Sequence, residues 1–407
     1  MSAKRSPDMW LFCLTIALLV IGVFMVFDAS YGRAGQVKYT GGDSFYFLKR
    51  QAAYALAGII MMFVAMYVRY WKLRRWGLIL LLISIIGLAL VFVPGFGVLV
   101  NGARRWIRIG PITIQPSEFA KLGLIVYLAA LLSAKKRDMR DFWHGLVPAL
   151  LPLLPIGALI MAQPDMGTTI VLTCVALAMV YIAGARKRHL AVVVALGFVL
   201  GCALIFSAPY RRERILSFVN PFEDYYGSGY QVCQSLIALG SGGIFGVGVC
   251  EGREKLFYLP AEHTDFILAV LGEEMGLIGT LTMVMLFLWF GARGLTVAYR
   301  TRHDFGRLLA GGISALICGQ ALLNMCVVTS SVPATGVPLP FISYGGSSLA
   351  MNLLCVGILL GVSKHPAPIE SYEYESRVNG GRHRRPRLSG DRYSRSPALS
   401  STRRAGL

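Results

Sequence analysis

The stretch YLPAEHTDFILAVLGEEMGLIG, residues 258–279, passes from a polar loop into a long apolar run and places five titratable side chains at that boundary. They are Glu262, His263, Asp265, Glu273 and Glu274. The whole chain of 407 residues has only 21 acidic residues, so four of them in this stretch are a marked concentration. Carboxylates in or beside a bilayer are costly and usually mark a substrate path, a binding site or proton chemistry.

The run that follows Asp265 is one of ten apolar segments, each about long enough to cross a bilayer as a helix. Apolar residues make up 55% of the chain and charged residues 15%, and the mean hydropathy is +0.60. The sequence therefore predicts an all-α polytopic membrane protein with about ten transmembrane helices. The first run has no convincing cleavage site after Ala29, so we expect a retained span. The predicted spans are 9–28, 51–69, 75–95, 118–134, 144–163, 166–184, 189–208, 266–292, 306–328 and 345–363.

The net charge of +19 follows the predicted loops. If the N-terminus is cytoplasmic, ten spans place most of the 40 lysines and arginines on the inner side, and every short inner loop is basic. This is the positive-inside pattern, and it predicts that both termini are cytoplasmic. The basic surface then faces anionic lipid, and we expect no nucleic-acid partner.

The predicted organisation is one membrane domain, residues 1–363, with a large, polar, glycine-rich outer loop at 209–265 between the seventh and eighth spans. Residues 364–407 are rich in Arg, Ser, Gly and Pro and lack apolar periodicity, so we expect a disordered basic cytoplasmic tail. The tail is either solvated and lipid-touching or a docking segment for a cytoplasmic partner. In the fifth span, Pro148, Pro152 and Pro155 predict a kinked helix.

Cysteine and glycine patterns exclude two kinds of site. None of the eight cysteines has metal-ligand spacing, so no protein-bound metal is predicted. Cys233 and Cys250 share the large outer loop and could pair in an oxidising compartment, although two unpaired thiols are favoured. The glycines of 240–248 lack the Lys-Ser/Thr ending and the strand–helix context of a nucleotide site, so nucleotide binding is rejected.

Two acidic positions stand at the outer start of predicted spans. Glu118 follows Gln-Pro-Ser, and Asp165 follows Gln-Pro. A carboxylate in the first turn of a helix is favoured by the helix dipole, so both could be simple caps. Lys121 lies one turn deeper than Glu118 on the same helix face. Such a pair inside a membrane is either a structural ion pair or part of a site.

Basic and hydroxyl side chains lie on the outer loops that flank these positions. Arg105 beside Trp106 could bind a phosphate or pyrophosphate, or contact lipid headgroups. Arg211 opens the large outer loop. Ser343 and Ser347, in the run PLPFISYGGSS at 338–348, enter the last span and could donate to phosphate or sugar oxygens.

Asp265 is the strongest candidate for chemistry. It lies where the large loop meets the eighth span, directly after Thr264, a residue type that caps helices. A carboxylate poised there could accept a proton from a sugar hydroxyl, or could be a helix-start acid without chemistry. His263 is as compatible with a loop hydrogen bond as with a site. Glu273 and Glu274 come about two turns later, where supporting or packing roles are favoured.

Together, NGARRWIRIGPITIQPSEFAKL, QPDMGTT, GSGYQ…GSGGIFGVG, YLPAEHTDFILAVLGEEMGLIG and PLPFISYGGSS resemble the SEDS family (shape, elongation, division and sporulation). The match runs in order over about 45–362. Within the family, FLKRQ at 47–51 and the long basic tail resemble the cell-division type, whereas VFDASYG at 26–32 departs from it. The resemblance implies ten transmembrane helices and an inverting peptidoglycan glycosyltransferase that polymerises lipid II at the outer face of the bacterial inner membrane, with septal synthesis as the expected role.

The resemblance also implies roles for individual residues. Asp265 matches the family's essential aspartate and would take the proton from the acceptor sugar hydroxyl. The other matched positions are Arg105, Trp106, Glu118, Lys121, Asp165 and Ser343 with its neighbouring glycines. In this hypothesis Arg105, Lys121 and Arg211 offset charge on the leaving pyrophosphate, and Glu118 orients Lys121.

The partners implied are lipid II, undecaprenyl-pyrophosphate-linked glycan, membrane lipids, a class B penicillin-binding protein and small bitopic division proteins. No cofactor is certain, and a divalent cation such as Mg²⁺ is left open. Two other functions are compatible with the sequence. A lipid II flippase would need no base at Asp265, and a non-catalytic scaffold for a transpeptidase would depend more on its loops and tail.

Overall fold

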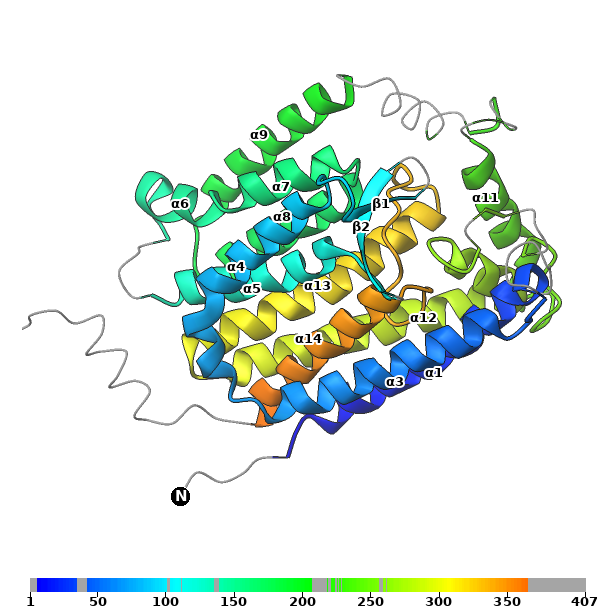
Figure 1. Ribbon diagram of the computed structural model, residues 1–407, viewed down its shortest axis with the longest axis horizontal. Helices are drawn as coiled ribbons and strands as arrows, with labels where there is room; N and C mark the ends of the chain where they lie inside the picture. Colours follow the sequence, from blue (N-terminus) through cyan, green and yellow to red (C-terminus); the bar gives the residue numbers. More distant parts are fainter. Residues whose placement is uncertain are drawn as a thin grey trace, which may run out of the picture. The chain divides into compact units, whose positions relative to one another are not determined.

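The computed structural model is mostly helical and describes residues 6–34, 42–100, 103–110, 112–134, 139–206, 218, 221–223, 225, 227, 229–255, 259–260 and 262–364 (Figure 1). The first half holds α1 (Met9–Ala34), α3 (Tyr46–Tyr67), the short η1 (Tyr70–Lys72), α4 (Leu73–Leu90) and α5 (Pro116–Leu132). A π-helical turn η2 (Phe142–Leu146) leads into α6 (Val147–Leu150), α7 (Leu153–Ala162), α8 (Met166–Ile182) and α9 (Lys187–Phe206). Then come α11 (Tyr230–Gly242), α12 (Ile267–Arg300), α13 (Asp304–Val328) and α14 (Gly346–Lys364).

Each of the ten predicted apolar runs overlaps one of these helical segments. Within the described part of the chain, seven segments are long and apolar enough to cross a membrane. The remaining three runs fall on α5 and α8, which have 17 residues each, and on α9. The predicted tail lies almost wholly outside the described residues.

The core of the bundle surrounds α13, which packs against α12, α8, α5 and α14. Helix α14 in turn lies along α3 (Figure 1). Gly357 and Gly361 of α14 make this close contact possible, because a Cβ on Gly357 would lie only 2.3 Å from the carbonyl oxygen of Met62. Small residues four apart are a common means of bringing membrane helices together.

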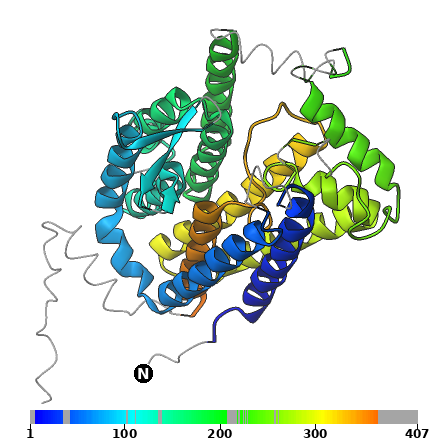
Figure 2. The ribbon, with the colours of Figure 1, turned by 45° about the vertical axis from the view of Figure 1, so that its right-hand side comes forward.

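Helix α9 differs from the central helices. It packs on α8, and most of its side chains are exposed. Figure 2 shows it at the edge of the bundle. An apolar helix with this exposure is suited to lipid contact.

A small antiparallel sheet occupies the predicted outer loop at 96–117. Strands β1 (Gly97–Val100), β2 (Ala103–Ile109) and β3 (Ile112–Ile114) pair in the order β1-β2-β3, and Trp106 faces Val98 across the first pair. From the sequence alone, this segment is expected to be a loop. The dipeptide Asn101-Gly102 falls between β1 and β2 in the sequence. Because Asn-Gly favours tight hairpins, it is the sequence feature that could have predicted these two strands.

Two helices are interrupted. The fifth predicted span breaks between α6 and α7, at Leu151–Pro152, as its prolines predict. Helix α12 breaks at Gly276, whose φ of 65° and ψ of −159° are not helical. Helix α11, which the sequence analysis did not predict, packs against α12 near this break.

Candidate active site

The segment that carries Asp265 is held by the loop before α14. The Ser343 hydroxyl donates to the carbonyl oxygen of Thr264 at 2.6 Å and accepts from the amide of Leu339 at 2.8 Å. The amide of Tyr344 donates to the carbonyl oxygen of His263 at 2.9 Å. Ser343 therefore acts on the backbone of the 262–266 segment, which fixes the approach to α12.

Asp265 itself is half-buried and is fixed through its backbone. The side-chain amide of Asn324, on α13, donates to the carbonyl oxygen of Asp265 at 2.7 Å and to that of Val337 at 2.9 Å. One buried amide thus joins the start of α12 to the 335–337 loop. The Asp265 carboxylate lies beside Gly336, where an added Cβ would be 3.6 Å from its Oδ2 atom.

The same loop meets the start of α8. Asp165 is the N-cap of α8, and its carboxylate accepts from the amide of Thr168 at 3.0 Å and from its hydroxyl at 2.9 Å. Two residues later, a Cβ on Gly167 would lie 2.8 Å from the carbonyl oxygen of Thr335. Asp165 therefore shapes the helix end that the 335–337 loop packs on.

Arg105, on β2, continues this chain of contacts. Its guanidinium donates from Nε to the carbonyl oxygen of Gln163 at 2.9 Å and from a terminal nitrogen to that of Pro164. The side-chain amide of Gln163 donates to the carbonyl oxygen of Leu88 on α4. Arg105 thus ties the small sheet to the turn before α8, and this use of its donors limits how it could also hold a pyrophosphate. Trp106, next to it, is half-buried in β2.

Glu118 and Lys121 form a buried ion pair in α5. Lys121 Nζ lies 2.7 Å from Glu118 Oε2, and the two side chains are only 3% and 4% exposed. Helix α5 packs against α4, α13 and α8. From the sequence, a structural pair and a site pair are both open; the two partners lie one turn apart on α5, and their depth of burial favours a structural pair.

His263 and Glu262, which precede Asp265 in the chain, are both buried. Glu262 is fully buried, and its Oε1 atom is 3.4 Å from His263 Nδ1. The His263 ring contacts the rings of Phe47 and Tyr344. Burial raises the pKa of Tyr344. This aromatic packing holds the His263 ring in the protein interior, two residues before Asp265 in the chain.

Two predicted site residues stand apart from these contacts. The Ser347 hydroxyl is buried at the start of α14 and forms no hydrogen bond with any described residue. Arg211 lies outside the described residues.

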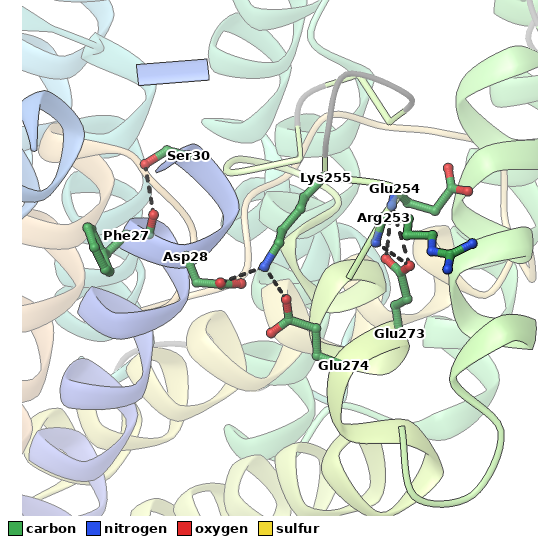
Figure 3. Close-up of polar contacts among 8 residues, drawn as sticks. All are labelled: Phe27, Asp28, Ser30, Arg253, Glu254, Lys255, Glu273 and Glu274. Atoms are coloured by element: carbon green, nitrogen blue, oxygen red, sulfur yellow. Dashed lines mark hydrogen bonds and ion pairs between the residues drawn. The ribbon is translucent and has the colours of Figure 1, made fainter. Parts of the chain in front are cut away.

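The structure also shows a buried ion cluster that sequence reasoning missed (Figure 3). Lys255 Nζ lies 2.6 Å from Asp28 Oδ1 and also pairs with Glu274 Oε1, and the three side chains are 8% exposed or less. We refer to Asp28, Lys255 and Glu274 as the ion triad. It joins α1, the segment after α11, and α12. Beside it, the Glu273 carboxylate accepts from the backbone amides of Arg253 and Glu254.

The signal for the triad was incomplete in the sequence. Asp28 is an acidic residue within an otherwise apolar helix, which is notable in itself. Its partner is 227 residues away in the chain, and no local spacing predicts that pairing.

Cys233 is buried, Cys250 is exposed, and both thiols are free. Among the described residues, no group of three or more His, Cys, Asp or Glu side chains is placed to hold a metal ion.

Four segments therefore converge at one end of the bundle: the 262–266 segment, the loop that precedes α14, the start of α8, and β2. We refer to this as the loop end. The arrangement holds one half-exposed carboxylate, Asp265, on a backbone fixed by hydrogen bonds from Ser343 and Asn324. A carboxylate held in this way can accept a proton from a bound hydroxyl.

Residues 9–367 match the model of a family described as cell cycle protein, which groups FtsW, RodA and SpoVE. The chain belongs to this family, the SEDS family of the sequence analysis, and is a multi-pass membrane protein. It is 45% identical over 362 residues to stage V sporulation protein E of Bacillus subtilis (strain 168), covering 89% of this chain and 98% of that one. It is 44% identical over 366 residues to a probable peptidoglycan glycosyltransferase FtsW of Geobacter sp. (strain M18), with the same coverages.

Two solved structures share the fold. A chain from a peptidoglycan synthase complex that coordinates polymerization and crosslinking superposes with a TM-score of 0.72 at 29% identity, covering 88% of this chain and 97% of that chain. The rod shape determining protein RodA of Thermus thermophilus gives a TM-score of 0.65 at 28% identity, covering 88% and 96%.

Proposed function

We propose that this protein is a peptidoglycan glycosyltransferase that polymerises lipid II into glycan strands. The observation that carries the proposal is Asp265, a half-exposed carboxylate on a rigidly held backbone at the loop end. The relatives named as glycosyltransferases, which align over nearly the whole chain, support the same reaction.

In the proposed mechanism, the growing glycan is the donor and is held by its undecaprenyl pyrophosphate, which is the leaving group, while lipid II is the acceptor. Asp265 removes the proton from the acceptor's sugar 4-hydroxyl as that oxygen attacks the anomeric carbon of the donor. The carbon–oxygen bond to the pyrophosphate breaks with inversion. General base catalysis of this kind contributes about 10²- to 10⁴-fold to a rate.

The other predicted residues would support this reaction by positioning Asp265 or by offsetting charge on the pyrophosphate. Ser343 positions the Asp265 segment through its two hydrogen bonds. Arg211 and the exposed Arg104 and Arg108 of β2 would meet the pyrophosphate, because the guanidinium of Arg105 is engaged with backbone carbonyls. Glu118 would orient Lys121, and because its carboxylate largely cancels the lysine's charge, the pair would support the site through structure more than through its field. A divalent cation such as Mg²⁺ would bind through the substrate's own phosphates.

For the topology, we propose ten crossings with both termini in the cytoplasm, so that the loop end faces outward from the bacterial inner membrane. The basic loops support this orientation. The role would be septal synthesis during cell division, with a class B penicillin-binding protein and small bitopic division proteins as partners. The similar identity to a sporulation protein makes peptidoglycan synthesis during sporulation the second candidate role.

The test is polymerisation of lipid II by the purified chain in vesicles, with and without a cognate class B penicillin-binding protein. We expect glycan strands from the wild type and none from Asp265→Asn, which keeps the side chain's shape but removes its basicity. Lipid II that crosses the bilayer equally with both variants, without polymer, would instead support a flippase. If polymer forms equally well with the wild type and with Asp265→Asn whenever the penicillin-binding protein is present, this chain is a non-catalytic scaffold for that partner.

A further inference from the structure

The segment predicted as a large outer loop contains a hairpin that runs into the bundle and back. The hydroxyl of Ser235, midway along α11, donates to the carbonyl oxygen of Val328, at the loop end of α13. Two turns further on, α11 reaches α12, because a Cβ on Gly242 would lie 2.0 Å from the carbonyl oxygen of Gly272. Helix α11 therefore descends from the loop end as its residue numbers rise.

After the hairpin, the chain returns to the loop end, where α11 begins. The side-chain amide of Gln231, at the start of α11, donates to the carbonyl oxygen of Pro260 at 3.3 Å. Between these two residues lies the hairpin, with α11 as its first arm. Its second arm runs past Lys255, and its tip is Gly243–Val249.

The tip fills the break in α12. An unbroken helix would join the amides of Leu277 and Ile278 to the carbonyls four residues earlier. Here those amides donate instead to the carbonyl oxygens of Gly243 and Ile244, at 2.9 and 3.3 Å. The carbonyls that the break leaves open, on residues 273 and 274, accept from the tip amides of residues 247 and 248 at 3.0 and 3.1 Å. Two bonds within the helix are exchanged for four bonds to the tip.

This pairing fixes the depth of the tip. Further along α12, the Trp289 ring contacts that of Trp10 in a tilted arrangement with centroids 5.2 Å apart, and Arg293 pairs with Asp8. Such a belt of aromatic and charged groups marks a membrane interface. At 1.5 Å per residue, residues 273–278 lie about 17–24 Å from Trp289 along α12. A hydrocarbon core of about 30 Å then extends beyond the tip by about 6–13 Å.

The side chains of the tip suit that depth. The tip, Gly243–Val249, contains no charged residue, and the exposed Glu251 and Arg253 follow it on the second arm. Phe245 is 81% exposed and Ile244 is 60% exposed, and Val247 and Val249 are exposed as well. These side chains continue the exposed apolar face of α12 at Met275, Leu277, Ile278 and Leu281. The buried ion triad lies at the same level but is closed off from that face.

We propose that residues 230–255 form a re-entrant membrane element whose tip, Gly243–Val249, lies in the lipid hydrocarbon of the leaflet at the loop end. The occupant of its exposed apolar surface is lipid acyl chain, because the tip is continuous with the apolar face of α12 and lacks the polar and charged groups of a surface loop. Irregular backbone at membrane depth needs its polar groups satisfied within the protein, and the bonds to α12 do this.

The test places an environment-sensitive fluorescent amino acid at residue 245 of the full chain in nanodiscs, without any partner protein. The same probe at Phe222 is the matched control. Phe222 is an equally large, exposed residue, and its neighbour Pro221 accepts from Cys233 in the first turn of α11, at the loop end. A probe at Leu281, exposed one turn further along α12, is the lipid-facing reference. All three probe variants should keep the wild-type unfolding temperature.

With phosphatidylcholine brominated on its acyl chains, we expect about a twofold or greater loss of fluorescence at residues 245 and 281 relative to residue 222. Aqueous iodide should quench the probe at residue 222 and spare the other two. Iodide quenching at residue 245 as strong as at residue 222 would overturn the proposal. So would photo-crosslinking from residue 245 in cells to a protein rather than to lipid, which would assign the surface to a partner's transmembrane helix.

Discussion

The stretch from Asp265, just before α12, to the break at Gly276 carries acidic side chains at both ends, and the two ends differ in how they are held. At the Asp265 end, neutral groups fix the backbone, and the carboxylate is half-exposed. At the Glu274 end, the carboxylate itself is the bonded group, and it is buried with Lys255 and Asp28. A half-exposed carboxylate on a fixed backbone can be reached by a ligand, whereas one locked in an ion cluster serves the fold. The difference favours Asp265 for the proposed chemistry and Glu274 for support of the fold.

The largest expected effect separates the two ends directly. Asp265→Asn should lower the rate of lipid II polymerisation by about 10²- to 10⁴-fold, because the amide cannot act as a base. The unfolding temperature should not change, because the bonds from Asn324 and Ser343 end on backbone carbonyls. Rates and thermal unfolding of the purified variant in detergent measure both. A variant that unfolds earlier, with activity lost in proportion, would contradict the assignment.

Lys255→Met should have the opposite profile. Removing one partner of a buried ion cluster leaves uncompensated charge and costs about 3–5 kcal/mol of stability. Here two buried carboxylates would lose their shared cation, so we expect a clear drop in unfolding temperature, with activity lost only as far as the protein unfolds.

Two matched variants sharpen that result. Lys49→Met removes the cation of an exposed pair with Asp43, 67% and 38% exposed, and should leave the unfolding temperature unchanged. The triple variant Lys255→Met, Asp28→Asn, Glu274→Gln removes all three charges and should recover much of the lost stability. If the single and triple variants were equally unstable, packing rather than charge would be the function of Lys255.

The contrast between the two ends also explains what the sequence could predict. Asp265 was found because it follows a polar loop and opens an apolar run, and both features are local. The proline breaks and the apolar helices are local patterns too. The ion triad depends on Asp28 and Lys255 meeting across 227 residues, which no local pattern encodes. Glu274 could be singled out from the sequence, but its partners Asp28 and Lys255 could not.

The large outer loop is a second case in which contacts between distant residues could not be predicted from the sequence. Its polar, glycine-rich composition predicted a loop, whereas α11 is a helix and the tip is held by bonds to the break at Gly276. A glycine in a helical pattern is usually tolerated without a break, so Gly276 alone did not predict one. The buried Glu118–Lys121 pair was predicted from i,i+3 spacing, because that contact is local.

A smaller effect is expected from the clamp on Asp265. Asn324→Ala leaves two buried carbonyls without their donor and should cost about 1–3 kcal/mol. Because Asp265 then loses its fixed position, the rate should fall by about 10- to 100-fold in kcat, more than the stability loss explains. Asn352→Ala is the control, since that buried amide donates to Ser348 within α14. An equal rate loss in both variants would mean that the clamp does not position the base.

The smallest effect concerns Asp165, which caps α8 next to the loop that reaches Asp265. Asp165→Ala should cost about 0.5–2 kcal/mol, because the amide of Thr168 loses its acceptor. Asp165→Asn keeps an acceptor oxygen and should retain most of that stability. If it also retains polymerisation, Asp165 belongs with Glu274 as a carboxylate that serves the fold. If Asp165→Asn is stable but loses polymerisation, the charge itself acts on the substrate, and the site at the loop end contains a second acidic group beside Asp265.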